Sequence, residues 1–146
     1  MKYEILEHRA DIKIKIFGET LKELFRNAVW AMASILYKNF PPEAGQPLAE
    51  KLTKTLVTKS ADREILLADF LNDILGESQI NQAVYPEVKF IEFYPEPVEG
   101  SARLKAEISG YPIERFDEDI KAVTYHDLSI RENKEGIWEA TILFDV

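Results

Sequence analysis

Apolar and charged residues alternate near the start of the chain. In residues 11–18, Ile12, Ile14 and Ile16 lie on one face of an extended backbone, and charged residues occupy the other face. This two-residue period is typical of a strand with one buried face. Residues 3–7 form a shorter segment before it. The sequence therefore predicts two short strands at this end of the chain.

Two later segments repeat apolar residues at the 3.6-residue period of an amphipathic helix. In the first, Thr20 and Glu23 have the spacing of a capping box, and the apolar pattern continues to Leu36. In the second, Asp62 is a suitable N-cap, and Gly76 predicts the C-terminal end. Two helices, over 21–36 and 63–75, are expected.

Five further segments are rich in β-branched and aromatic residues and predict strands. They are residues 48–59, 88–94, 103–110, 120–131 and 137–146. Residues 95–100 would close a hairpin, and the proline-rich stretch 39–47 is expected to be a loop. The pattern predicts an α+β fold, in which two amphipathic helices cover one face of a largely antiparallel or mixed sheet. No linker divides the chain, so we expect one domain over residues 1–146.

Composition excludes several classes of function. The chain has 18 Lys and Arg against 26 Asp and Glu, a net charge of −8, which disfavours direct binding to nucleic acid or anionic lipid. It has no cysteine, so disulfides, thiolate metal sites and cysteine nucleophiles are excluded. Neither a secretory signal nor an apolar run of about 20 residues occurs. We therefore expect a cytoplasmic protein with no membrane partner.

Common catalytic motifs are also missing. The sequence has no glycine-rich phosphate loop, no metalloprotease histidine pair and no nucleophile elbow. Its two histidines are His8 and His126. Each is either a general acid or base, or an ordinary strand-end or loop residue with a satisfied hydrogen bond.

Two aspartates point to a different chemistry. Asp11 and Asp145 both lie opposite an apolar stripe, so their carboxylates face away from the core. If the two strands are neighbours, these acids converge, and the terminal carboxylate and carbonyl of Val146 add further oxygens. Oxygen ligands suit Ca²⁺, Mg²⁺ or Mn²⁺. The alternative is that both are solvated acids at strand ends.

Lys121 is the most informative cation. It lies in the segment 120–126, where a lysine on a polar strand face is either solvated or directed at a phosphate or an acidic partner. The acidic connector at 114–119 precedes it. Such a run is most often a solvated loop, and secondarily a docking surface or a further shell of acids around a metal.

Several of these segments together resemble the archease family. They occur in the family's order along essentially the whole chain: His8–Ile14, Gly18–Phe25, Ala61–Asp62, Leu66–Leu67, Phe70–Asn72, Ile120–His126 and Phe144–Val146. Two departures stand out. Arg9 replaces the threonine expected there, and residues 115–119 lack an Arg-His pair found in many relatives. The second departure bears on the partner surface around the connector.

The resemblance implies a small, non-enzymatic helper of an RtcB-type RNA ligase. That ligase joins RNA ends bearing a 2′,3′-cyclic phosphate or 3′-phosphate to 5′-hydroxyl ends in tRNA splicing or RNA repair, after guanylylation of its own histidine. Archease-like proteins promote this guanylylation, allow multiple turnovers and can broaden the nucleotide that the ligase accepts. RNA would be reached only through the ligase.

The resemblance also implies a metal site. Carried onto this sequence, its ligands are Asp11, Asp145 and Val146, with Ca²⁺ the first expectation and Mg²⁺ or Mn²⁺ the alternatives. Lys121, His8 and His126 are candidate contacts to the ligase or its nucleotide.

Two rival functions follow from the same residues. The first is a stand-alone, metal-dependent phosphoesterase in which Asp11 and Asp145 hold the cation and His8 or His126 is the base. The second is a general RNA chaperone, which the net charge of −8 disfavours.

Overall fold

A computed structural model describes residues 2–8, 11–39, 51–95 and 101–146. The elements run in the order β1 (Tyr3–His8), β2 (Asp11–Gly18), α1 (Leu21–Leu36), β3 (Leu52–Ser60), α2 (Arg63–Asn81), β4 (Ala83–Pro95), β5 (Ala102–Pro112), β6 (Ala122–Glu132) and β7 (Trp138–Asp145). Neither helix is long and apolar enough to cross a membrane.

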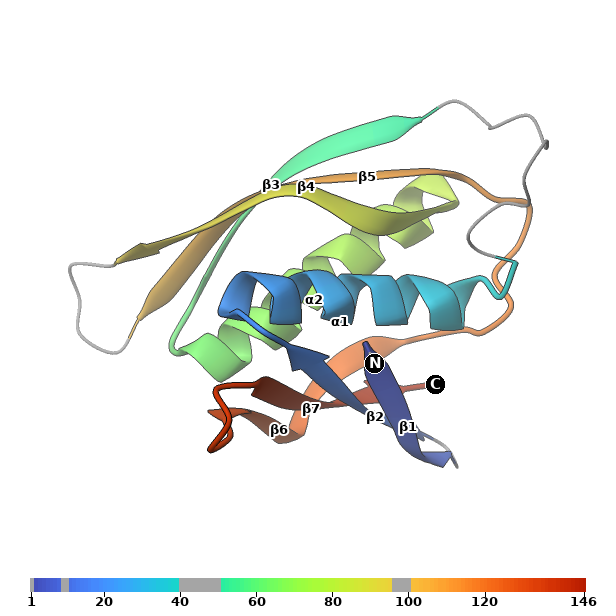
Figure 1. The fold of residues 1–146 in the computed structure, drawn as a ribbon. Helices are drawn as coiled ribbons and strands as arrows, with labels where there is room; N and C mark the ends of the chain where they lie inside the picture. The colour runs from blue at the N-terminus through green and yellow to red at the C-terminus, as the bar shows by residue number, and fades with distance from the viewer. Residues whose placement is uncertain (1, 9–10, 40–50, 96–100) are drawn as a thin grey trace.

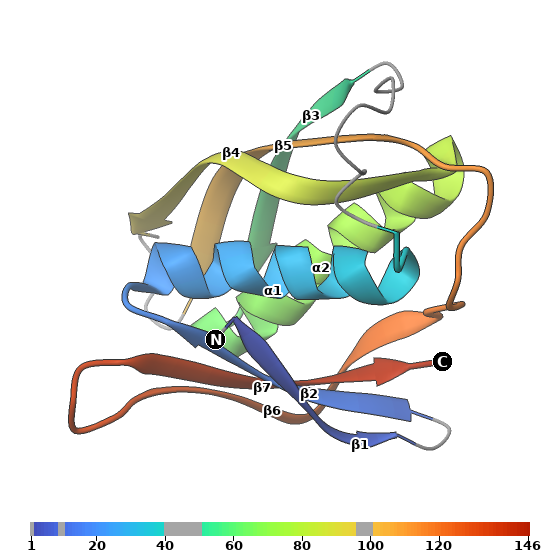
Figure 2. The same cartoon turned by 45° about the vertical axis from the view of Figure 1, so that its right-hand side comes forward.

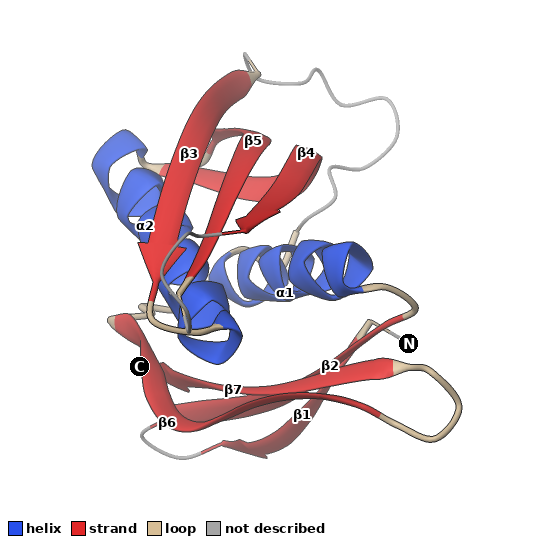
Figure 3. Ribbon diagram, turned by 90° about the vertical axis from the view of Figure 1, so that its left-hand side faces the viewer, coloured by secondary structure: helices blue, strands red, loops and turns tan. Residues whose placement is uncertain are grey.

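The strands form two antiparallel sheets (Figure 1). One has four strands in the order β1-β2-β7-β6, and the other has three in the order β3-β5-β4. Both helices lie between the sheets, so each sheet has one face covered (Figure 3). The expected α+β class and antiparallel pairing are confirmed. The sequence pattern did not show that the strands divide over two sheets.

The core fills the layer between the sheets. Ile14 and Ile16 of β2 are fully buried, as the alternating pattern predicts, and Phe25 of α1 lies in the same cluster. The Phe25 ring packs edge-on against Phe93 of β4 at 4.9 Å between centroids and lies 6.3 Å from Phe70 of α2. Burial of these aromatic side chains is a major source of stability.

Both predicted helix starts are confirmed. The backbone N–H of Glu23 donates to the Thr20 hydroxyl at 3.1 Å, and the N–H of Ile65 donates to the Asp62 carboxylate at 2.8 Å. Each cap satisfies one of the helix's unpaired N–H groups.

The predicted end of the second helix at Gly76 is wrong. Helix α2 continues to Asn81 and ends where Gln82 adopts a left-handed conformation with φ 50°. Tertiary contacts hold this last part, because Ser78 is fully buried and the Gln79 amide donates to the carbonyl of Ile120 at 3.1 Å. One glycine inside a helix costs only about 1 kcal/mol relative to alanine, which such contacts outweigh.

Strand boundaries shift as well. Strand β4 begins at Ala83, ahead of the predicted start at residue 88, because its pairing with β5 continues through a bulge between Val84 and Glu87. Strand β3 begins at Leu52. The expected loop at 39–47 and hairpin turn at 95–100 fall mostly outside the described residues.

Candidate metal centre

Asp11 and Asp145 are directly opposite each other in neighbouring strands. Strands β2 and β7 are neighbours in the four-stranded sheet (Figure 2). Their register places Asp11 opposite Asp145 and Ile12 opposite Phe144. Ile12 and Phe144 are buried, whereas Asp11 is half-buried and Asp145 is exposed. Residues directly opposite in an antiparallel pair have Cβ atoms about 4.5–5.5 Å apart. The structure therefore brings the two predicted acids together at one end of the sheet.

Lys121, the residue directly before β6, lies at the same end of the sheet. The backbone N–H of Lys121 donates to the carbonyl of Asp145 at 2.7 Å, and Ala122 pairs with Asp145 across β6 and β7. The Lys121 side chain is exposed. Val146 follows directly and packs part of its side chain against the core. Lys121 thus lies at the same end of the sheet as the two aspartates.

Helix α2 holds this end of β6 in position. The Asn72 side-chain amide donates to the carbonyl of Val123 at 2.8 Å, and its oxygen accepts the N–H of Val123 at 2.8 Å. Val123 is buried. The sequence pattern did not predict this role for Asn72. The one feature that could have indicated it is a side-chain amide next to the apolar stripe of the helix.

The structure gives the two histidines different positions. The backbone of His8 lies opposite Ile12, one residue from Asp11, and its side chain is outside the described residues, as is Arg9. His126 is exposed in β6, in the irregular segment between Thr124 and Ser129. The strand pairing places Ala122, and not His126, opposite Asp145.

A bulge in β6 gives His126 another partner. The pairing shifts between Thr124 and Ser129, and Asp127 adopts a left-handed conformation with φ 57°. Its carboxylate lies 3.6 Å from Nε2 of His126 and 3.4 Å from Nζ of Lys13. The sequence pattern did not predict a contact between Asp127 and Lys13. The contact depends on a bulge, and the sequence has no glycine there that would indicate one.

The bulge also contacts α2, through an aspartate that bonds to β3 as well. The Tyr125 hydroxyl donates to one oxygen of Asp69, and the Ser60 hydroxyl donates to the other at 2.5 Å. The hydrogen bond to Asp69 raises the pKa of Tyr125, since it is made by the protonated hydroxyl. These contacts fix the bulge against the helix, away from the paired aspartates.

One acid of the connector has a structural role. The Asp117 carboxylate accepts the backbone N–H of Lys38 at 2.6 Å, and the Asp117 N–H donates to the carbonyl of Leu36 at 2.8 Å. Asp117 thus closes the C-terminal end of α1. Glu114, Arg115 and Asp119 are exposed, as expected for a solvated loop.

The arrangement suits a hard cation with few protein ligands. Within the part of the chain that the structure describes, no cluster of three Asp, Glu or His residues has the geometry of a metal site. Further ligands to an ion at Asp11 and Asp145 would be main-chain oxygens or water, as is common for Ca²⁺ and Mg²⁺. Like charges directly opposite in a sheet repel each other, so a bound cation would relieve this repulsion.

Comparison with known proteins agrees with this architecture. Residues 3–146 match the Archease protein family. An archease from Methanosarcina acetivorans is 36% identical, with 99% of this chain and 96% of the relative covered; one from Pyrococcus abyssi is 29% identical, with 99% of each covered.

Two solved structures share the fold. The solution structure of Methanobacterium thermoautotrophicum protein 1598 has a TM-score of 0.68 and 22% identity, covering 99% of this chain and 98% of its own. The crystal structure of a Thermotoga maritima protein, described as an archease and possible chaperone, has a TM-score of 0.64 and 21% identity, covering 98% and 96%. The match over nearly the whole chain establishes that this protein belongs to the archease family.

Proposed function

We propose that this protein is an accessory factor that activates an RtcB-type RNA ligase by promoting its guanylylation, and so supports multiple turnovers in tRNA splicing or RNA repair. The observation that carries the proposal is the direct pairing of Asp11 with Asp145, in a member of the archease family. The protein itself would carry out no chemical step, and it would widen the choice of nucleotide by acting on the ligase.

A divalent cation is part of the proposal. Asp11 and Asp145 would hold it with a main-chain oxygen of Val146, and Ca²⁺ fits such oxygen ligands with Mg²⁺ or Mn²⁺ as alternatives. When bound, the ion would supply positive charge near the nucleotide phosphates of the ligase. The protein's own residues would fix the position of that charge through β2, β6 and β7.

Lys121 is the proposed contact to the ligase or its nucleotide. Its side chain is exposed, and its backbone is fixed by the hydrogen bond to the carbonyl of Asp145. An exposed cation on a fixed backbone suits a phosphate or a carboxylate on a partner. The overall charge of −8 favours a basic, RNA-binding enzyme as the partner rather than RNA itself. His8 and His126 remain secondary candidates for this surface.

The test is a ligation time course in which the ligase is limiting and GTP and a divalent metal are supplied. Wild-type protein should carry the ligase well past one product per ligase molecule. Asp11→Asn and Asp145→Asn keep the size of the side chain but remove the charge, so they should reduce stimulation at least tenfold. Glu132→Gln is the matched control, because Glu132 is exposed at the opposite end of the β6–β7 pair.

Two results would overturn the proposal. One is normal stimulation by both aspartate variants, which would remove the metal site from the mechanism. The other is a ligase that stops at one product per molecule with or without the protein. Metal-dependent phosphoester hydrolysis by the protein alone would then favour the phosphoesterase alternative.

A further inference from the structure

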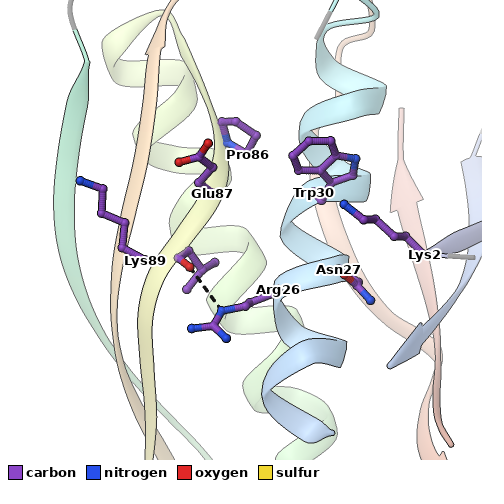
Figure 4. Close-up of a pocket in the computed structure, with 8 residues that line it drawn as sticks. Lys2, Arg26, Asn27, Trp30, Pro86, Glu87 and Lys89 are labelled. Carbon is purple, nitrogen blue, oxygen red and sulfur yellow. Dashed lines mark hydrogen bonds between the residues drawn. The ribbon is translucent and has the colours of Figure 1, made fainter. Parts of the chain in front are cut away.

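A basic and aromatic groove lies between α1 and β4, away from the paired aspartates. It has a volume of about 310 Å³ and is lined by residues of α1, β4 and the segment before β1. Figure 4 shows Lys2 and Trp30 close together on one wall, with Pro86 on the other. Pockets for small ligands begin at about this volume.

Arg26 reaches across the groove from α1 to β4. Its Nε donates to the carbonyl of Val88 at 3.3 Å (Figure 4), which links the guanidinium to β4. Its two terminal nitrogens form no hydrogen bond or ion pair with another described residue. A guanidinium held in this way presents a fork of donors that matches phosphate oxygens.

Lys2 and Trp30 form the aromatic part of the groove. The Lys2 ammonium lies 3.8 Å from the centroid of the Trp30 ring, a cation–π contact. The backbone of Lys2 is anchored, because its carbonyl accepts the N–H of Phe17 at 3.1 Å. The groove thus combines an indole ring with a cation over the face of that ring.

Negative charge is directed away from this space. Glu87 is the one carboxylate among the lining residues described, and it lies 3.6 Å from the Lys51 ammonium. It also accepts a hydrogen bond from the Ser109 hydroxyl at 3.3 Å. Lys2, Arg26 and the lining residue Lys89 form no ion pair with a described carboxylate. The groove is therefore locally positive in a protein of net charge −8.

The geometry favours a small ligand over a peptide strand. Strand β4 is an edge of its sheet, but bulges interrupt its pairing on both sides of Glu87. Pro86 lacks an N–H, and Arg26 already occupies the carbonyl of Val88. Bulges and proline on an edge prevent the addition of another strand.

We propose that this groove binds a small phosphate ester with a planar aromatic group, the chemistry of a mononucleotide. The terminal nitrogens of Arg26 hold the phosphate, the Lys2 ammonium moves from the Trp30 ring to the phosphate, and the planar group takes its place against Trp30, opposite Pro86. The inference does not rest on the proposed function, because it concerns binding by the protein alone.

The test measures binding of AMP, adenosine and pyrophosphate by calorimetry and by NMR in the presence of EDTA, so that the paired aspartates hold no metal. AMP should bind more tightly than adenosine or pyrophosphate. The protein has two tryptophans, and the indole N–H signal of Trp30 should shift on binding while that of Trp138 stays in place. Arg26→Ala should weaken AMP binding about tenfold.

Two more variants separate the parts of the groove. Trp30→Leu should weaken AMP binding and leave pyrophosphate binding unchanged. Lys134→Ala removes an exposed cation from the turn between β6 and β7, outside the groove, and should have no effect. Arg26 is exposed, so its variant keeps the test valid even if Trp30→Leu fails to fold.

Three outcomes would overturn the inference. The first is no AMP binding at millimolar concentration. The second is AMP binding that Arg26→Ala leaves unchanged. The third is displacement of AMP by a short poly-glutamate peptide of equal affinity, because the groove would then be a docking surface for an acidic protein segment.

Discussion

Asn72 bonds to both backbone groups of Val123, with two hydrogen bonds of 2.8 Å. Strand β6 is an edge of the four-stranded sheet, so this side of Val123 has no neighbouring strand. The Asn72 amide supplies the donor and the acceptor that such a strand would offer. A helix side chain thereby fixes the end of β6 at which Lys121 bonds to Asp145.

Replacing Asn72 should therefore both destabilise the protein and impair the neighbouring site. Asn72→Ala leaves the N–H and the carbonyl of a buried residue unpaired, at a cost of about 2–3 kcal/mol. Urea denaturation should show this loss. Stimulation of the ligase should also fall, although no proposed metal ligand is changed.

Asn72→Asp is the informative comparison. It keeps an acceptor for the N–H of Val123 and loses the donor to the carbonyl, so its stability should be intermediate if the carboxylate adopts the same position. Equal stability of Asn72→Ala and wild type would show that the two bonds contribute nothing.

Replacing one of the paired aspartates should change the free energy of unfolding in opposite directions with and without metal. In EDTA, Asp11→Asn should raise the free energy of unfolding by about 0.2–1 kcal/mol, because it removes repulsion between like charges directly opposite in a sheet. With Ca²⁺ at 100 times its dissociation constant, wild type should gain about 2.7 kcal/mol. The variant should lose most of that gain.

Thermal unfolding with a calcium titration measures both effects. Glu132→Gln serves again as the control and should keep the full calcium effect. If none of Ca²⁺, Mg²⁺ and Mn²⁺ changes the melting temperature of the wild-type protein, the proposed metal site is contradicted.

Gly76→Ala should stabilise the protein. Gly76 lies inside α2, and a Cβ atom placed there meets no other atom within 4 Å. Alanine should add about 0.5–1 kcal/mol to the free energy of unfolding, since glycine has the higher conformational entropy when unfolded. Urea denaturation measures the change, and a loss of stability would mean that the helix does not run through this position.

Gly110→Ala should have the opposite effect. A Cβ atom at Gly110 would lie 1.8 Å from the carbonyl oxygen of Val84, so β4 and β5 would have to separate. Both partners are backbone in a buried region, and we expect a loss of more than about 3 kcal/mol or failure to fold. A folded Gly110→Ala protein with wild-type stability would contradict this close approach of the strands.

Tyr111 makes the free energy of unfolding depend on pH in the alkaline range. Burial raises its pKa from 10.0 to about 12, with the neighbouring Tyr37 and Glu87 acting in the same direction. The unfolded chain therefore releases this proton before the folded chain does. The contribution of protonated Tyr111 to the free energy of unfolding is fully present below pH 10 and is lost as the pH rises to about 12. Tyr111→Phe should flatten that decline in denaturation curves.

Absorbance of tyrosinate during a pH titration provides the direct measurement. The chain has six tyrosines, and Tyr111→Phe should remove the step near pH 12. If the step persists in the variant, another tyrosine is responsible.

Local periodicity explains which features could be predicted. The alternation of Ile12, Ile14 and Ile16 fixed the direction of the β2 side chains, and so it also placed Asp11 off the core. The same reasoning applied to Asp145. Pairing of β2 with β7 remained conditional, because it joins segments far apart in the sequence that carry no local signal for each other.

Other features depend on tertiary context. The bulge at Asp127 places a residue other than glycine at positive φ, a conformation that aspartate adopts more often than most residues but that is uncommon for any of them. The contact between Arg26 and Val88 joins a helix to a distant strand. Neither feature leaves a periodic pattern in the sequence, so both became visible only in the structure.

The pairing of β2 with β7 has a consequence for synthesis on the ribosome. Strand β7 is the last element in the chain, so every other strand of its sheet is made before it. Until β7 inserts, β2 and β6 each expose an edge to other nascent chains, and the two aspartates remain apart. A chain without β7 would therefore be prone to aggregation through these two edges, and Asp11 would have no partner strand opposite it.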